Sequence, residues 1–283
     1  MLRDRMQLRP PAPALLRRQH SLMALTLLGL VAAGLLLFAP AGRRAEAKID
    51  RCGAGNDQAA LDMQLPHVAQ ALKAARPVVV VAFGSSSTYG TGASALDKTY
   101  PSRLAALLAR RFPHAGITVL NRGVSGESAA ATLVRVDSDV IAAHPALVIW
   151  QIGTNDVLRD VEPAAAGEVI RKGVLRMQQA GIDVVLMDVQ FAPAVLRHLN
   201  FREMERVIAA EGRALDVPVI HRFAMMREWA EERRMPFSVM LGRDHLHMTD
   251  ASYDCLARQV GRSIALAARA TFLEAYGVNI ARP

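Results

Sequence analysis

Five short apolar runs, with helical patterns between them, constrain the fold more than any other feature of this sequence. The runs are rich in β-branched residues and mostly lack the apolar–polar alternation that marks a half-exposed strand. Such runs are typical of strands buried on both faces of a parallel sheet. They cover residues 78–83, 117–120, 146–150, 182–187 and 217–220. The sequence therefore predicts a five-stranded parallel sheet.

The segments between these runs carry apolar residues at helical spacing. Leu104, Leu108 and Phe112 share one helical face, and Pro101 stands where the first turn of a helix tolerates proline. A last helix is expected from Asp250, a favourable N-cap residue. Strands that alternate with helices in this way predict an α/β three-layer α/β/α sandwich of the flavodoxin-like class.

Polar segments follow the first three of these expected strands. They are Gly84–Gly90, Asn121–Glu127 and Gly153–Asp156, and a further polar segment, Asp244–His247, stands just before the last helix. In open α/β sheets, sites lie beyond the carboxyl ends of the strands. These segments are therefore the candidates for a functional site.

The four segments, in this order and at these places, resemble the GDSL/SGNH family of serine hydrolases. The resemblance covers roughly residues 78–270. It implies the same sandwich fold and the hydrolysis of carboxylic esters or thioesters, with no cofactor and no metal. Together with the periplasmic placement argued below, it leads us to expect a small-molecule, glycan or lipid ester as the substrate.

The resemblance also implies a role for each matching residue. Ser86 matches the nucleophile, and Asp244 and His247 match the Asp-x-x-His pair that completes the catalytic triad. The backbone N–H groups of Ser86 and Gly126 and the side-chain amide of Asn155 match the oxyanion hole. A serine hydroxyl needs a neighbouring base to attack an ester, and each oxyanion donor contributes about 3 kcal/mol to transition-state stabilisation.

Three positions depart from the family pattern or compete with it. Ser85 stands where the family has aspartate, a residue outside the triad, and Met248 follows the catalytic histidine where proline is common. His245 is a rival base, but its spacing from Asp244 favours His247.

Other functions stay open on the residues alone. Asp244, His245 and His247 are potential metal ligands, but no third histidine or cysteine lies at ligand spacing. The Ser/Thr/Gly segment after the first strand resembles a phosphate loop but lacks the Gly-Lys-Ser/Thr ending. An acyltransferase acting on envelope glycan, or a catalytically inactive glycan-binding domain, would share the fold.

The basic charge is concentrated in the N-terminal segment. Residues 1–51 hold nine basic and three acidic residues, so only about +2 of the net charge of +8 belongs to the rest of the chain. No basic stripe with interleaved aromatic residues supports binding to nucleic acid.

Residues 1–20 are expected to be a basic cytoplasmic segment and residues 21–41 a membrane-spanning signal anchor. The apolar stretch at 22–39 is about 18 residues long and follows five arginines, which places the remainder in the periplasm. Cleavage as a signal peptide, after Ala41 or Ala47, is the alternative. Residues 42–76 are then a linker and a helix interrupted at Pro66, and residues 77–283 the hydrolase domain.

Cys52 and Cys255 are the only cysteines in the chain. Export would place both in an oxidising compartment, where paired cysteines are usually joined. We therefore expect a disulfide between them, which requires Cα atoms no more than about 7 Å apart.

Overall fold

The computed structural model describes residues 52–53, 64–232 and 235–274, all of which belong to the compact unit Asp50–Pro283. The expected cytoplasmic segment, the expected anchor, and residues 42–51 and 54–63 of the expected linker and helix lie outside the described residues. Within the described ranges, no helix has both the length and the hydrophobicity to cross a bilayer.

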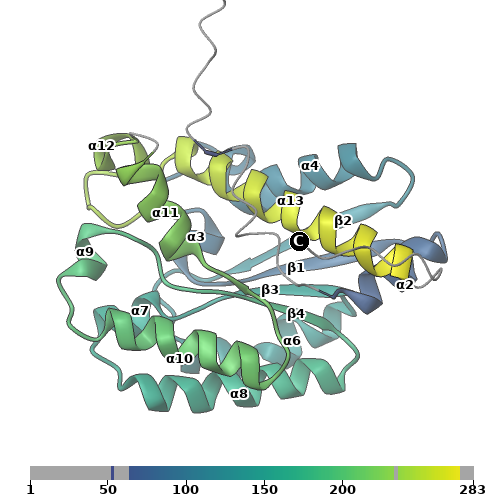
Figure 1. Cartoon of the computed structure of the whole chain (residues 1–283), viewed down its shortest axis with the longest axis horizontal. Coiled ribbons are helices and arrows are strands. Elements are labelled where there is room, and N and C mark those ends of the chain that lie inside the picture. The colour runs from purple at the N-terminus through teal and green to yellow at the C-terminus, as the bar shows by residue number, and fades with distance from the viewer. Residues whose placement is uncertain (1–51, 54–63, 233–234, 275–283) are drawn as a thin grey trace, which may run out of the picture. The chain divides into compact units, whose positions relative to one another are not determined.

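The sheet has the five parallel strands that the sequence predicted, and their order is β2-β1-β3-β4-β5 (Figure 1). The strands are β1 (Val78–Gly84), β2 (Ile117–Gly123), β3 (Leu147–Gln151), β4 (Asp183–Met187) and β5 (Val219–Ile220). This strand order reverses direction between β1 and β3, and such a switch point opens a crevice at the carboxyl ends of the strands.

The burial of the strands explains their apolar sequences. All of β3 and β4 is buried and β1 is buried almost throughout, because helices cover both faces of the sheet. The strand β2 is at the edge of the sheet and is partly exposed, and it pairs with β1 from Val78–Ile117 to Gly84–Gly123. It therefore extends three residues beyond the apolar run and includes Asn121 and Arg122.

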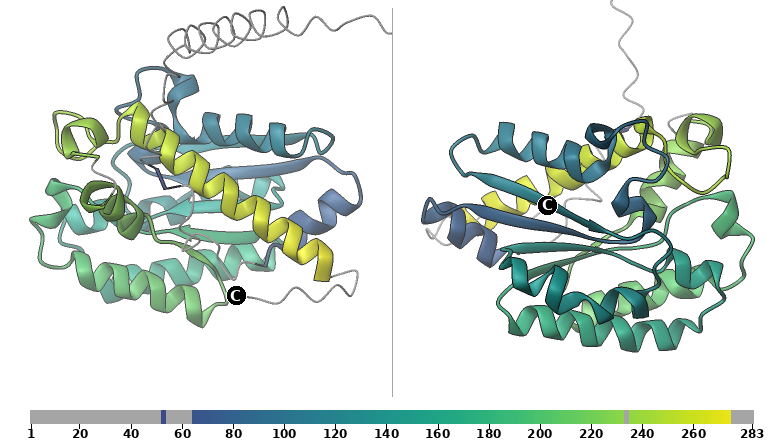
Figure 2. Two further views of the ribbon diagram at one scale, coloured as in Figure 1. Left: turned by 45° about the horizontal axis from the view of Figure 1, so that its top comes forward. Right: turned by 180° about the vertical axis from the view of Figure 1, so that it is seen from behind.

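Helices form one layer on each side of the sheet (Figures 1 and 2). On one side lie α4 (Tyr100–Arg111) and α13 (Asp250–Glu274), and α2 (Pro66–Lys73) packs against α13. On the other side lie α8 (Pro163–Gln179), α10 (Phe201–Ala214) and α5 (Ala129–Val134). The three-layer sandwich is thus confirmed.

The other helical elements of the described chain are mostly short. They are α3 (Ser86–Tyr89), η2 (Leu96–Lys98), α6 (Val136–Asp139), η3 (Ile141–Ala143), α7 (Thr154–Leu158), α9 (Pro193–Leu196), α11 (Arg222–Glu231) and α12 (Phe237–Met240). Two of them, α3 and α7, directly follow β1 and β3 and so begin at the carboxyl edge of the sheet.

Helix starts differ from the sequence prediction at two places. Pro66 is the first residue of α2 rather than an interruption, because a first-turn N–H needs no intrahelical partner. Asp250 is the first residue of α13 rather than its N-cap, and its carboxylate accepts hydrogen bonds from the backbone and hydroxyl of Ser94. Leu65, which directly precedes α2, and Val68 within α2 join the main core, so this helix belongs to the hydrolase unit.

The fifth strand is two residues shorter than predicted. Pro218 has no N–H for the ladder, and the N–H of Val217 donates to Gly212 at the end of α10. Pairing with β4 therefore starts through the carbonyl of Pro218, which accepts from Leu186.

A disulfide joins Cys52 to Cys255, with 5.0 Å between the two Cα atoms. The carbonyl of Cys52 also accepts hydrogen bonds from the indole of Trp229 (3.2 Å) and the amide of Gln259 (2.8 Å). The segment that precedes α2 is thus attached to α13 by a covalent bond and to both α11 and α13 by hydrogen bonds.

Candidate active site

Ser86 is the first residue of α3 and lies just beyond the end of β1. The turn is closed by hydrogen bonds from the N–H groups of Thr88 (3.0 Å) and Tyr89 (2.9 Å) to the carbonyl of Ser85. Ser86 is largely buried, and its hydroxyl has no hydrogen-bond partner among the described residues, His247 included. The hydroxyl is therefore not committed to a structural contact.

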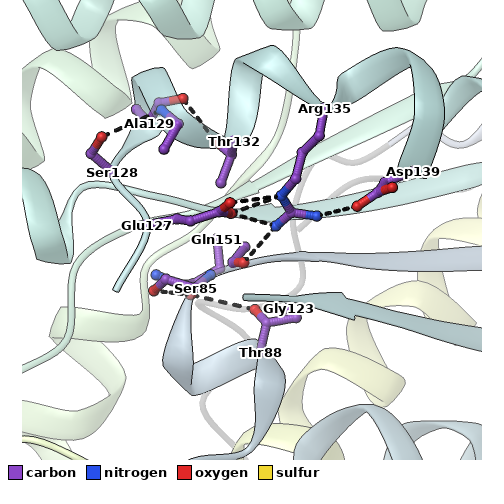
Figure 3. Close-up of polar contacts among 12 residues, drawn as sticks. Ser85, Thr88, Gly123, Glu127, Ser128, Ala129, Thr132, Arg135, Asp139 and Gln151 are labelled. Carbon is purple, nitrogen blue, oxygen red and sulfur yellow. Dashed lines mark hydrogen bonds and ion pairs between the residues drawn. The ribbon is translucent and has the colours of Figure 1, made fainter. Parts of the chain in front are cut away.

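Gln151, the last residue of β3, explains how the chain accommodates Ser85 (Figure 3). Its side-chain oxygen accepts from the backbone and the hydroxyl of Ser85, both at 3.0 Å, and from the hydroxyl of Thr88 at 3.3 Å. An aspartate at position 85 would place a carboxylate oxygen, which only accepts hydrogen bonds, against the side-chain oxygen of Gln151, which is also an acceptor. The Gln151 amide would then have to flip. The turn before Ser86 is thus held by neutral groups.

Gly126 lies in the loop after β2 with a φ of +84°, a left-handed conformation that strongly favours glycine. Its carbonyl accepts a hydrogen bond of 2.6 Å from the guanidinium of Arg159, which follows α7. This bond connects the loop after β2 to the segment after β3.

Asn155 lies in α7, and its side-chain amide donates to the carbonyl of Glu127 at 2.9 Å. The next residue, Asp156, accepts the N–H of Ala129 at 3.1 Å on both carboxylate oxygens. Burial raises the pKa of Asp156, although these backbone donors oppose the shift. Asn155 and the Gly126 loop are therefore held side by side at the carboxyl edge of the sheet.

Asp244 and His247 form a hydrogen-bonded pair, with 2.5 Å between the Asp244 Oδ2 and the His247 Nδ1. The backbone N–H groups of Leu246 (3.1 Å) and His247 (3.0 Å) donate to the other carboxylate oxygen. Partial burial acts to raise the pKa of Asp244, but these hydrogen bonds outweigh it and the pKa is lowered. Because an ionised Asp244 holds the proton on Nδ1, the Nε2 of His247 is left as the basic nitrogen.

The carboxylate of Asp244 binds the ring of His247 and not that of His245. His245 has a φ of +56°, and its carbonyl accepts from the N–H of Ala194. The backbone at position 245 thus turns the loop between Asp244 and His247.

Direct contacts connect the histidine loop to the segment around Ser86. The hydroxyl of Ser87 donates to Gln190 (3.0 Å), whose amide donates to the carbonyl of Leu246 (2.6 Å). Gly92 packs so closely against the loop that a Cβ there would lie 3.2 Å from the Cβ of His247. The structure therefore brings the predicted nucleophile segment and the predicted base together, while their catalytic roles stay predictions.

Sequence reasoning missed several polar residues that hold this site. Gln151 ends the strand β3, and Gln190 follows the strand β4. A polar residue at the end of an apolar run was a signal available in the sequence. Arg222 is fully buried and donates to the hydroxyl of Thr154 (3.0 Å) and the carbonyl of Asp188 (3.1 Å). Burial lowers the pKa of Arg222 to about 10, and no local motif marked it.

Two characterised relatives match parts of the chain. The esterase TesA of Pseudomonas aeruginosa is 29% identical over 117 residues, which are 40% of this chain and 58% of that protein. An acetylxylan esterase of Geobacillus stearothermophilus is 37% identical over 79 residues, 28% of this chain and 33% of that protein. The matches thus span between one third and three fifths of these relatives.

Solved structures share the fold over more of the chain. The acetylxylan esterase Axe2 of Geobacillus stearothermophilus superposes with a TM-score of 0.56 at 23% identity, covering 66% of this chain and 94% of that one. The model of the non-GDSL lipase-like family matches residues 51–270. That description agrees with the serine at position 85. The chain therefore belongs to the non-GDSL lipase-like family.

Proposed function

We propose that this protein is a carboxylic ester hydrolase that works through an acyl-enzyme on Ser86. The observation that carries the proposal is the Asp244–His247 pair, whose loop packs against Gly92, just after α3, and is connected through Gln190 to Ser87 within α3. Membership of a lipase-like family and the similarity to named esterases support the same chemistry.

Each residue of the triad has a distinct part in the proposed reaction. The Nε2 of His247 takes the proton of the Ser86 hydroxyl as the serine attacks the ester carbonyl. Asp244 stabilises the imidazolium that forms, because its lowered pKa keeps it ionised. His247 then protonates the leaving alcohol. In the second half of the reaction His247 deprotonates a water molecule, which attacks the acyl-enzyme, and the proton then returns to the Ser86 oxygen as the carboxylic acid leaves.

The developing oxyanion is stabilised by three donors in this proposal. They are the backbone N–H groups of Ser86 and Gly126 and the side-chain amide of Asn155. One hydrogen of the Asn155 amide is bound by the carbonyl of Glu127, which orients the planar group and leaves the second hydrogen for the oxyanion.

The substrate that we propose is a short-acyl or envelope-associated ester of a glycan, a lipid or a small molecule. The similarity to an acetylxylan esterase supports a small acyl group, and the similarity to an arylesterase of Vibrio mimicus supports ester hydrolysis. We also propose a periplasmic location with residues 21–41 as an inner-membrane anchor, on the sequence pattern alone.

The test is hydrolysis of a series of aryl esters, from acetyl to palmitoyl, by the purified protein and three serine variants. Ser86→Ala is expected to abolish hydrolysis. Ser85→Ala and Ser87→Ala are matched controls that keep measurable activity, because each removes only a hydrogen bond to a glutamine.

Two outcomes would contradict the proposal. An equal loss of hydrolytic activity in all three variants would contradict the role of Ser86 as nucleophile. If the wild type hydrolysed no ester, the proposed esterase function would be wrong. Adding a soluble glycan acceptor separates hydrolysis from acyl transfer, because a transferase forms the glycan ester in place of the free acid.

A further inference from the structure

Arg135, which follows α5, lies at the centre of a largely buried polar network (Figure 3). Its Nε donates to both carboxylate oxygens of Glu127 at 3.0 and 2.8 Å, and its Nη1 donates to Asp139 at 2.6 Å. Its Nη2 donates to the carbonyl of Gly84 at 3.1 Å and lies 2.6 Å from the Glu127 carboxylate. The guanidinium also lies 4.5 Å from the centre of the Phe83 ring.

The partners of Arg135 belong to the segments that hold the proposed oxyanion donors. Gly84 lies two residues before Ser86, and its carbonyl also accepts the N–H of Val124 from the loop after β2. Glu127 follows Gly126, and its own carbonyl holds the amide of Asn155. One guanidinium therefore connects the end of β1 and the segment after β2 directly, and the segment after β3 through Glu127.

Only an arginine side chain suits this arrangement. Its planar group offers five N–H donors in a fixed geometry, whereas a lysine ammonium is a point charge on a flexible stem. The side chains of Arg135 and Glu127 are only 14% and 17% exposed, so the contacts between them are weakly screened by water. The network is thus rigid enough to fix the positions of backbone groups.

We propose that Arg135 is a positioning residue that aligns the oxyanion hole, by holding the Gly84 carbonyl and the Glu127 segment in one fixed geometry. This inference rests on the proposed ester hydrolysis, but it concerns a residue that does not touch the substrate. Without the guanidinium, the hydrogen bond from Val124 to the Gly84 carbonyl still joins the two strand ends, but the Glu127 side chain loses its link to Gly84, so the carbonyl that orients Asn155 is held less firmly relative to the turn into α3.

The test compares Arg135→Met, Arg135→Lys and Asp139→Asn in the full-length protein. We expect both Arg135 variants to lower kcat roughly 10- to 100-fold, with a much smaller change in KM, because misplaced oxyanion donors weaken the transition state selectively. Asp139→Asn is the matched control, since it removes one ion pair of Arg135 and leaves its contacts with Gly84 and Glu127. Its kcat is expected to stay within about twofold of the wild type.

Chemical rescue distinguishes positioning from a merely structural role, because kcat should recover only if the guanidinium group itself aligns the site. Added guanidinium or methylguanidinium ion is expected to raise the kcat of Arg135→Ala at concentrations that leave the wild type and Asp139→Asn unchanged. Thermal unfolding of each variant identifies those that are folded at the assay temperature. If the Met and Ala variants do not fold, the kcat and KM of Arg135→Lys still test the inference.

The inference is overturned if the folded Arg135 variants keep the wild-type kcat, or if Asp139→Asn lowers kcat as much as they do. A change confined to KM would also overturn it. The proposed function fails in a different way, because then the wild type itself shows no Ser86-dependent hydrolysis.

Discussion

Removing the Cys52–Cys255 disulfide is expected to lower the free energy of unfolding by about 5 kcal/mol at 25 °C. The two cysteines are 203 positions apart, and the loop-closure entropy of a cross-link of that length gives this value as an upper estimate. For a domain of this size, the same loss lowers the melting temperature by roughly 10–20 °C.

The assay is reversible urea unfolding of the wild type and of Cys52→Ala/Cys255→Ala, each with and without dithiothreitol. Cys255 is fully buried, so replacing it by alanine also creates a small void, which lowers the free energy of unfolding further. Reduction of the wild type breaks the same bond without a void, which makes it the matched control. The variant is expected to be insensitive to dithiothreitol.

A loss below about 1 kcal/mol in the reduced wild type would refute this reasoning. It would mean that the hydrogen bonds of the Cys52 carbonyl with Trp229 and Gln259 hold the segment in place without the bridge. Two free thiols in denatured, unreduced protein from the periplasm would show that the bridge does not form there.

Three further predictions concern the proposed oxyanion hole, a partly buried carboxyl group and the topology of the chain. Asn155→Ala is expected to lower kcat by roughly 10²- to 10³-fold with a smaller change in KM, and a change in KM alone would make Asn155 a substrate-binding residue. Burial and the charge of Asp188 raise the pKa of Glu205 to about 7, so the folded protein loses stability as the pH rises from about 4.5 to about 7. The melting temperature of Glu205→Gln should therefore exceed that of the wild type above pH 7 and converge with it below pH 4.5, whereas a pH-independent difference would contradict this cause. Alkaline phosphatase fused after Pro283 should be active in cells, because the basic residues precede the apolar segment, and an inactive but stable fusion would contradict periplasmic placement.

The fold was largely predictable because strand burial leaves a direct record in the sequence. The runs at β1 and β3 are apolar throughout and the run at β4 is apolar except for Asp183, since both faces of these strands are covered. The ends of the strands were less predictable where a strand is exposed to solvent or contains a proline. Asn121 and Arg122 extend the exposed edge strand β2, and Pro218 shortens β5.

The candidate site could be proposed from local motifs where these fall at strand ends, as for Ser86 and Asn155, or just before the last helix, as for the Asp244–His247 pair. The residues that hold these motifs in place were not predictable, because their partners are distant in the sequence. Arg135 is 51 positions from Gly84, and Gln190 is 103 positions from Ser87. A single sequence contains no local pattern that pairs such residues.

The most direct test of the central claim is mass spectrometry of the protein after reaction with a fluorophosphonate. We expect one label per molecule, on the hydroxyl of Ser86, and a much slower reaction in the His247→Ala variant, because the base is needed to activate the serine. A label on Ser85 or Ser87, or equal labelling without His247, would contradict the assignment of the nucleophile and its base.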